Sequence, residues 1–485
     1  MIAMKRKNLL IFNFCLIVVL FQTAGAQTAW TPVKRAIAAS IDRQRTDLTG
    51  MSDAIWGFAE TAFLETQSAD VLAAYAEQQG FRVQRGLAEM PTSIVAEYGS
   101  GKPIIGILGE FDALPGLSQK AQVEKEPLVE GAPGHGCGHN LFGVASLGAA
   151  TAIKEMIASG QLQGTVRFYG TPAEEKYFGK LYLARAGLFD DLDVCLDWHP
   201  GPVNDANTNS SMALIDYIIE FYGKAAHAAL DPWNGRSAVD AMELYTTGLN
   251  YLREHILPTS RIHYQIEKAG DVANVVPEYA RIWTRIRDPK RENMMAVYER
   301  ALKIAQGASL MAEVDYKVTL MSGLHEILVN RAGATALHDN MELVGPIQYT
   351  SGEQDYAKGI QRATGKPEVG LDGSIMPLQE TVPITQGAST DVGDVSWIVP
   401  EIGLTGATAP LGTPWHSWAV VACGGMSIGH KGMIFAAKSL ALTMADLFQN
   451  PDLVAAVKKE FRERKGDYNY KPILPDAPPP IPAKG

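Results

Sequence analysis

The spacing of apolar residues predicts how the chain is organised. Over residues 29–80 they recur every three or four positions, as at Ile37, Ile41 and Leu48, which predicts a helical opening. Short apolar runs then alternate with helical stretches. The expected strands are 103–108, 165–169 and 194–198, and the expected helices are 141–159 and 180–186. This alternation is typical of an α/β domain with a mainly parallel sheet.

The pattern changes near residue 211. It predicts, in order, a strand over 213–222, a helix over 237–255, strands over 261–268 and 279–288, a helix over 291–306 and a strand over 313–321. This β-α-β-β-α-β order indicates an inserted ferredoxin-like α+β domain. After residue 323, helices that include 334–344 and 430–448 return the chain to α/β material.

These patterns divide the chain into segments. We expect an α/β domain in two parts, 27–211 and 324–465, an inserted domain over 212–323 and a tail over 466–485. Prolines crowd the tail, at Pro472, Pro475, Pro478, Pro479, Pro480 and Pro482. Such a composition favours an extended or disordered segment over a folded one.

The first residues have the features of an export signal. Lys5, Arg6 and Lys7 precede an apolar run over 9–21, and Ala24-Gly25-Ala26 follows. This predicts a signal peptide over 1–26 that is cleaved after Ala26, and hence a secreted or periplasmic protein. An uncleaved anchor is the alternative, but the run falls short of the about 18 to 20 residues that span a bilayer. We expect no membrane association after cleavage.

Composition and charge narrow the class further. The chain has 485 residues, of which 46% are hydrophobic and 20% charged, which is typical of a soluble globular enzyme. Cleavage would remove three of the 43 basic residues and none of the 53 acidic ones, leaving a formal charge of −13. That charge disfavours nucleic acid as a partner. The remaining cysteines, Cys137, Cys195 and Cys423, are odd in number and cannot all pair within one molecule.

The sequence Gly134-His135-Gly136-Cys137-Gly138-His139-Asn140 concentrates metal-binding chemistry. Thiolate and imidazole are good ligands for zinc and similar ions, and the glycines let both side chains approach one point. The alternative is a glycine-rich turn with incidental histidines. Other segments decide between the two.

Polar residues follow several expected strands, where open α/β sheets place their sites. Asp112 suits the role of holding a ligand imidazole. Glu174 and Glu175 are adjacent carboxylates, of which one can bind a metal while the other accepts a proton from water, unless they only form a solvated helix start. His199 follows the next strand, and His416 lies in a loop near the C-terminal helices.

Together these motifs resemble metallopeptidase family M20, in the amidohydrolase branch that includes auxin-conjugate, hippurate and aminobenzoyl-glutamate hydrolases. The resemblance runs from about residue 37 to 447 and rests on 109–115, 134–140, 171–175, 198–200 and 414–418. It implies two divalent metal ions per subunit, Zn or Mn, held by Cys137, His139, Glu175, His199 and His416. It also implies Glu174 as general base, with Asp112 supporting the site.

The resemblance assigns further roles in the inserted domain, which it implies is a lid and dimerisation domain. His227 matches a lid histidine that reaches the partner subunit's site in a homodimer and stabilises the oxyanion. Asn274 and Arg287 match positions that contact the carboxylate or carbonyl of the substrate. The implied substrate is a small N-acyl or N-aroyl amino acid, whose amide bond is hydrolysed.

Two other functions stay open on the same fold: a dipeptidase or aminoacylase, and a non-catalytic binding protein. A complete set of ligands and base argues against the binding protein, and Cys137 argues for the amidohydrolase branch. The chain departs from the family at Asn140, where auxin-conjugate hydrolases have Asp, and at residues 176–180, where the family has glycines. Tyr177 and Phe178 should therefore reshape the acyl pocket.

Overall fold

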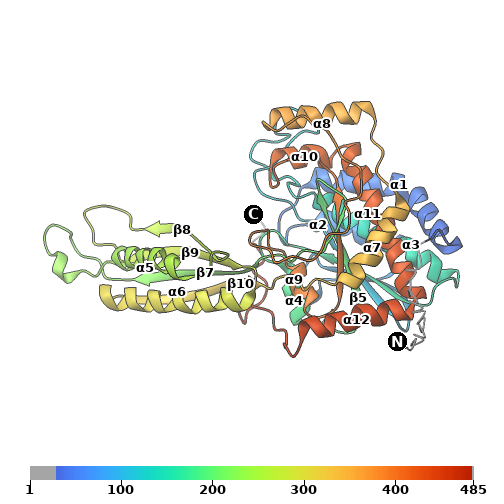
Figure 1. The fold of residues 1–485 in the computed structure, drawn as a ribbon. Helices are drawn as coiled ribbons and strands as arrows, with labels where there is room; N and C mark the ends of the chain where they lie inside the picture. The colour runs from blue at the N-terminus through green and yellow to red at the C-terminus, as the bar shows by residue number, and fades with distance from the viewer. Residues whose placement is uncertain (1–28, 483–485) are drawn as a thin grey trace, which may run out of the picture.

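The computed structural model describes residues 29–482, so the predicted signal peptide lies outside the described residues. Within that range the chain forms a large seven-stranded sheet and a separate four-stranded sheet. Figure 1 shows the large sheet inside a body covered by helices, from which the small sheet and its helices project. We call this projection, residues 213–324, the arm.

The large sheet has a parallel centre and antiparallel edges. Its strands, in spatial order, are β1 (Arg82–Arg85), β2 (Ile94–Ser100), β4 (Gly164–Thr171), β3 (Ile104–Glu110), β5 (Val194–Gly201), β11 (Glu401–Ala407) and β6 (Asp205–Ala206). The four strands from β4 to β11 run parallel, whereas β1, β2 and β6 pair antiparallel. The predicted α/β class is confirmed, and the antiparallel edges are an addition to it.

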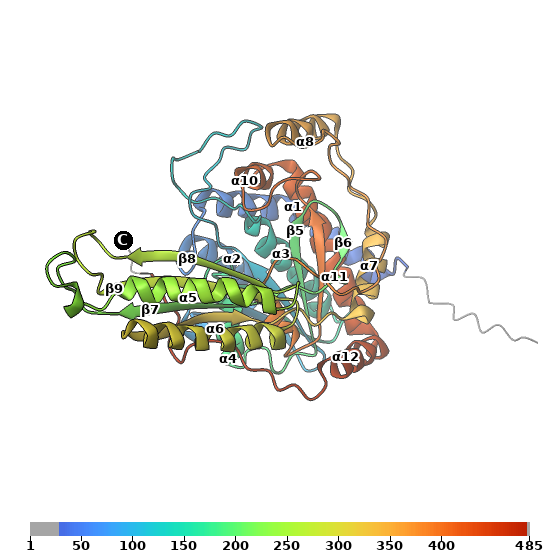
Figure 2. The ribbon, with the colours of Figure 1, turned by 60° about the vertical axis from the view of Figure 1, so that its left-hand side comes forward.

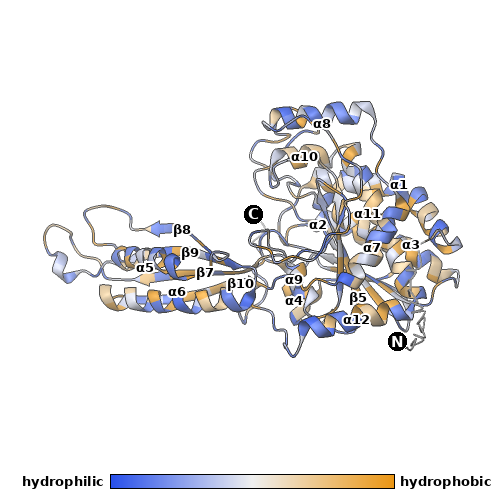
Figure 3. Ribbon diagram, viewed as in Figure 1, coloured by the Kyte–Doolittle hydropathy of each residue, from blue (hydrophilic) through white to orange (hydrophobic). Residues whose placement is uncertain are grey.

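The core of the body lies between this sheet and its helices. The helices are α1 (Pro32–Phe58), α2 (Thr66–Gln78), η1 (Leu87–Glu89), α3 (His139–Ala158), α4 (Gly179–Arg185), α7 (Arg331–Val344), α8 (Ser351–Ala363), α9 (Val392–Ser396), α10 (Trp418–Gly424), α11 (Ser427–Gln449) and α12 (Pro451–Lys465). Ile37, Ile41 and Leu48 of α1 are fully buried, as their helical spacing predicts. Helix α3 is long and apolar enough to cross a membrane, but 78% of that stretch is buried in this core. The outer helices α8 and α12 are mostly hydrophilic (Figure 3).

The arm has the predicted β-α-β-β-α-β order. Its sheet consists of β10 (Asp315–Leu324), β7 (Ala213–Tyr222), β9 (Tyr279–Asp288) and β8 (Arg261–Ala269), and its helices are η2 (Pro232–Asn234), α5 (Ala238–Leu252), η3 (Arg253–His255) and α6 (Arg291–Ala312). Helices α5 and α6 lie side by side over one face of this sheet (Figure 2). Strand residues alternate between the faces, so Tyr217 and Ile219 pack under the helices while Asp216 and Ile218 point to the open face.

The proline-rich tail takes the extended form of the two that its composition favours. The Gly323 N–H at the end of β10 donates to the Ile473 carbonyl oxygen at 2.7 Å. The guanidinium of Arg185 donates to the carbonyl oxygens of Pro475 and Ala477. The tail is therefore packed against both the body and the base of the arm.

Candidate metal centre and active site

The predicted ligand residues converge at the carboxyl ends of the parallel strands. Asp112 follows β3, Glu174 and Glu175 follow β4, and His199 lies in the last turn of β5. His139 is the first residue of α3, and His416 comes from the loop before α10. Because parallel strands end at the same edge of a sheet, segments that are far apart in the chain meet there.

Cys137 lies at the centre of this cluster. Its thiol belongs to one group with His139 and His199, and to a second group with Glu175 and His416. In each group the possible ligand atoms all lie within 4.8 Å of one another. The donors are a thiolate, imidazoles and a carboxylate, which suit a borderline divalent ion. The geometry thus offers two neighbouring metal sites that share one thiolate.

Hydrogen bonds orient the imidazoles toward the cluster. His139 Nδ1 donates to Asp112 Oδ1 at 2.9 Å, and Asp112 Oδ2 accepts from the Glu175 backbone N–H at 2.9 Å. His199 Nδ1 lies 2.7 Å from the Pro200 carbonyl oxygen, which can only accept. Both rings therefore present an unprotonated Nε2 as a ligand atom. Asp112 also fixes the Glu175 backbone, in agreement with a supporting role.

Unusual backbone conformations hold the ligand loops. Gly138 has φ +79° at the N-cap of α3, where a side chain would be strained, and this lets His139 begin the helix. Ala173 and His416 have φ of 62° and 54°, which is uncommon for residues other than glycine. The Ala173 N–H donates to the buried Glu65 carboxylate at 3.0 Å, which stabilises the turn before Glu174.

The cluster carries an excess of buried negative charge. Burial and the carboxylates of Glu110 and Glu175 raise the pKa of Glu174 well above its ordinary value. Burial, with Asp112 and Glu110 nearby, raises the pKa of Glu175 to about 7. Within the described residues Glu110 Oε2, His139 Nε2 and Glu175 Oε1 are buried without a hydrogen-bond partner. Unpaired buried acceptors facing one point fit a bound cation.

A buried ion pair behind the cluster was missed by sequence reasoning. Lys180 Nζ, fully buried, lies 2.5 Å from Glu110 Oε1 and 2.6 Å from Asp391 Oδ1. Although burial lowers it, the carboxylates of Asp391 and Glu110 raise the pKa of Lys180. Glu110 also joins His139 and Glu174 in a third group of possible ligands. Glu110 lies in a motif already noted, but no sequence pattern connects Lys180 with Asp391.

The residues proposed to contact substrate from the arm do not join the cluster. The loop after β7, which carries His227, lies at the end of the arm that points away from the body (Figure 1). His227 and Asn274 are exposed there, and the Ala228 N–H donates to the Asn274 carbonyl oxygen at 3.0 Å. The structure thus brings these two residues together and separates them from the metal ligands of the same chain.

Arg287 lies in β9 and lines a pocket on the open face of the arm with Trp283 and Arg285. Its Nε is buried without a partner, and burial together with Arg285 lowers the pKa of its guanidinium. A cation in these surroundings is stabilised by a bound anion. Arg287 is therefore available to an anionic ligand.

The remaining residues of the glycine-rich motif have structural roles. His135 Nε2 lies 3.0 Å from the Ile55 carbonyl oxygen, and the ring is buried away from the cluster. Asn140 donates to Ser52 and to the Gly424 carbonyl oxygen, which ties α3 to α1 and α10. Among the described cysteines Cys137, Cys195 and Cys423 are all buried and free, so Cys137 is available as a ligand.

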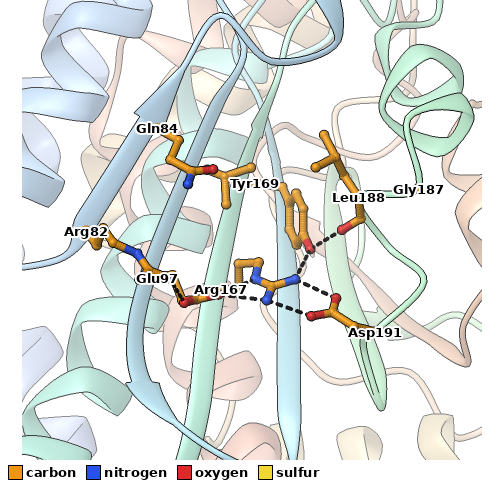
Figure 4. Close-up of a pocket in the computed structure, with 9 residues that line it drawn as sticks. Arg82, Gln84, Glu97, Arg167, Tyr169, Gly187, Leu188 and Asp191 are labelled. Carbon is orange, nitrogen blue, oxygen red and sulfur yellow. Dashed lines mark hydrogen bonds and ion pairs between the residues drawn. The ribbon is translucent and has the colours of Figure 1, made fainter.

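A second cavity, of about 310 Å³, lies over β1, β2 and β4 (Figure 4). Arg167 is its central charge, but the guanidinium is already bound by both oxygens of Asp191 and by Glu97. Its Nη1 also donates to the Tyr169 hydroxyl. Because these partners satisfy the guanidinium, this cavity offers less to a ligand than the cluster does.

Comparison with known proteins agrees with the site. The chain belongs to peptidase family M20/M25/M40, whose model matches residues 106–463. It is 38% identical to one of the two subunits of the p-aminobenzoyl-glutamate hydrolase of Escherichia coli (strain K12), over 93% of this chain and 99% of that protein. It is 28% identical to the Xaa-Arg dipeptidase of Mus musculus, over 89% and 92%. The crystal structure of the aminobenzoyl-glutamate utilization protein from Klebsiella pneumoniae shares the fold, with a TM-score of 0.58, 19% identity and coverage of 86% and 98%.

The family that the motifs predicted is therefore confirmed. The protein is a hydrolase of this family that acts on amide bonds, and its cluster has the donors of a metal-binding site. Which ions it binds, which amide it cuts and how its subunits assemble are finer questions.

Proposed function

We propose that the protein is a two-metal amidohydrolase that cuts the amide bond between an acyl or aroyl group and an amino acid. The observation that carries this proposal is the position of Cys137, shared between two groups of ligand atoms. One ion would be held by Cys137, His139 and His199, and the other by Cys137, Glu175 and His416. Zinc or manganese suits these donors.

Divalent ions bound there would lower the pKa of a water molecule and polarise the amide carbonyl. Glu174 is placed to accept the proton of the attacking water, because it is buried beside the ligands. Its raised pKa lets it keep that proton and then give it to the leaving amine. Asp112 keeps His139 and the Glu175 backbone in place throughout.

The arm would bind the rest of the substrate. Arg287, with its unpaired buried Nε, suits the carboxylate of the amino-acid part. His227 and Asn274 are exposed at the tip of the arm, which supports a role in a second subunit's site. In a homodimer His227 of one chain would then stabilise the oxyanion formed in the other chain.

A substrate panel tests the proposed reaction. The purified protein, supplied with zinc or manganese, is incubated with N-acetyl, N-benzoyl and N-(4-aminobenzoyl) derivatives of glutamate and other amino acids. Release of the free amino acid is measured. We expect turnover of at least one N-acyl amino acid, and its abolition by chelation. Activity that survives complete metal removal would contradict the proposal.

A dipeptidase is the second candidate, because the Xaa-Arg dipeptidase of Mus musculus is also similar over most of both chains. Including dipeptides with C-terminal arginine in the same panel separates the two functions. A kcat/KM for such a dipeptide above that for every N-acyl amino acid would favour the dipeptidase.

Metal binding by Cys137 can be tested directly, with Cys195 and Cys423 as internal references. All three thiols are buried, so burial alone protects them equally. Mass spectrometry after brief thiol alkylation should show that chelation makes Cys137 reactive and leaves the other two protected. Equal reactivity of Cys137 with and without metal would contradict its role as a ligand.

Export remains a proposal that rests on residues 1–26. N-terminal sequencing of the protein expressed in a bacterial host should find Gln27 as the first residue of the exported form. Retention of Met1 in a cytoplasmic form would contradict it.

A further inference from the structure

A cavity of about 330 Å³ lies beside the metal cluster, where the arm meets the body. Glu175 forms part of its wall, so a substrate whose amide reaches the cluster extends one end into this cavity. Tyr177 contributes from the body and Trp283 from the arm. Pro480 of the proline-rich tail also lines it.

Strand alternation explains why the arm presents these side chains. Ile282, Thr284 and Ile286 of β9 are buried on the side of α5 and α6. The residues between them, including Trp283 and Arg285, therefore lie on the open face of the sheet and line the cavity.

The charges around the cavity are already paired with one another. Arg285 Nε lies 2.7 Å from Asp216 Oδ1, and Arg281 Nε lies 2.6 Å from Glu267 Oε2. The surfaces that remain for a ligand are aromatic and apolar, from Tyr177, Tyr182, Ile218, Trp283, Met321 and Pro480. Such walls suit a flat apolar group better than a second carboxylate.

The bulky residues after Glu175 divide between two roles. Tyr177 lines the cavity, and its ring is stacked on Phe63 with centroids 5.3 Å apart, which fixes its orientation. Phe178 is instead buried against Leu181 and Leu214. Of the two residues expected to shape the acyl pocket, only Tyr177 faces it.

Several contacts fix the tail where it approaches the cavity. The Tyr468 hydroxyl lies 2.8 Å from His325 Nε2, and the Tyr470 hydroxyl donates to Asp394 Oδ1 at 2.9 Å. Further along, Ile473 pairs with the end of β10, and Arg185 holds the carbonyl of Ala477. Figure 1 shows this last part of the chain, in dark red, passing from α12 to the base of the arm.

Proline keeps the last step of the tail rigid. Pro478, Pro479 and Pro480 restrict the backbone to extended conformations, and Pro479 is itself buried. A segment anchored at Ala477 and stiffened in this way holds Pro480 in position at little entropic cost.

We propose that the C-terminal tail is a wall of the acyl pocket and that Pro480 limits the size of the acyl group. This inference rests on the proposed amidohydrolase function, because it assigns the aromatic or apolar acyl group to the cavity beside Glu175. The amino-acid carboxylate would lie toward the neighbouring pocket of Arg287, which shares Trp283 and Arg285 with this cavity.

The test compares Pro480→Trp with Pro478→Trp. Both place the same large side chain in the tail, but Pro478 is exposed and does not line the cavity. For Pro480→Trp we expect kcat/KM for an N-benzoyl amino acid to fall about 10-fold or more, because a pocket that loses volume rejects the larger group. For the N-acetyl derivative of the same amino acid, and for Pro478→Trp with either substrate, the change should stay within about twofold.

Binding gives a readout independent of turnover. Calorimetric titration of the same two compounds into Glu174→Gln protein, with and without Pro480→Trp, should show weaker binding of the benzoyl compound only. Removal of residues 478–485 should reduce the preference between the two acyl groups while the anchors from Tyr468 to Ala477 remain. Equal effects on both acyl groups, or none, would overturn the role of the tail. A wild-type protein that hydrolyses neither compound would instead contradict the proposed function.

Discussion

The metal cluster and the tip of the arm differ in what surrounds them. Cys137, His139 and Glu174 are buried, and hydrogen bonds from several elements of the same chain fix their neighbours. His227 and Asn274 are exposed at the far end of the arm. Buried polar groups need partners in the folded chain, whereas exposed groups can await a second molecule. The comparison teaches that one chain assembles the ligands, and that the tip acts only if another chain supplies its target.

The largest expected effect concerns the buried region. Glu174→Gln removes the group that moves protons and leaves the predicted ligands unchanged, so kcat should fall by about three to four orders of magnitude. Metal analysis of the same sample should find normal content. Near-normal turnover would exclude Glu174 as the general base, and lost metal would make it a ligand instead.

The buried ion pair should govern stability. Lys180→Met leaves Glu110 and Asp391 without their common partner and should lower the free energy of unfolding by about 3 to 5 kcal/mol. Lys176→Met is the matched control, because Lys176 is exposed four residues earlier, and its effect should stay within about 0.5 kcal/mol. Denaturant unfolding measures both variants. Similar midpoints would show that the pair contributes little.

The tip of the arm should show the opposite behaviour. His227→Ala should leave the unfolding midpoint unchanged, because the side chain is exposed, yet lower kcat about 100- to 1000-fold through loss of an oxyanion donor. Mixing it with Glu174→Gln protein should restore about a quarter of wild-type activity, if half of the dimers are mixed and each has one good site of two. If the subunits exchange and no activity returns, His227 does not act in the partner.

The smallest effect is expected at Arg287. Arg287→Ala should raise KM about 10- to 100-fold, because it removes one charged contact to the substrate carboxylate. Amidation of that carboxylate should weaken wild-type protein similarly and the variant little further. Arg261→Ala, exposed on β8, serves as control. A loss in kcat with unchanged KM would argue against carboxylate binding.

Local patterns predicted much of the fold. The bounds predicted for β7 and β9 agree with the structure, and α3, α5 and α11 lie close to their predicted positions, because periodicity reports which face of an element is buried. The short strands β1 and β6 and the outer helices α8 and α12 were not predicted. An edge strand and a largely hydrophilic helix show weak periodicity, since little of either faces the core.

The sequence by itself determined the family and the residues of the cluster, because ligand chemistry is local and the motifs carry the donors next to glycines that allow their approach. Tertiary structure decided which groups meet. Lys180 pairs with Asp391 and Glu65 holds Ala173 across long stretches of chain, and their partners are defined only once the sheet has formed. It also placed Pro480 beside Glu175 and His227 far from it. Composition describes what a segment can be, whereas the contacts that fix its place depend on the packing of the whole molecule.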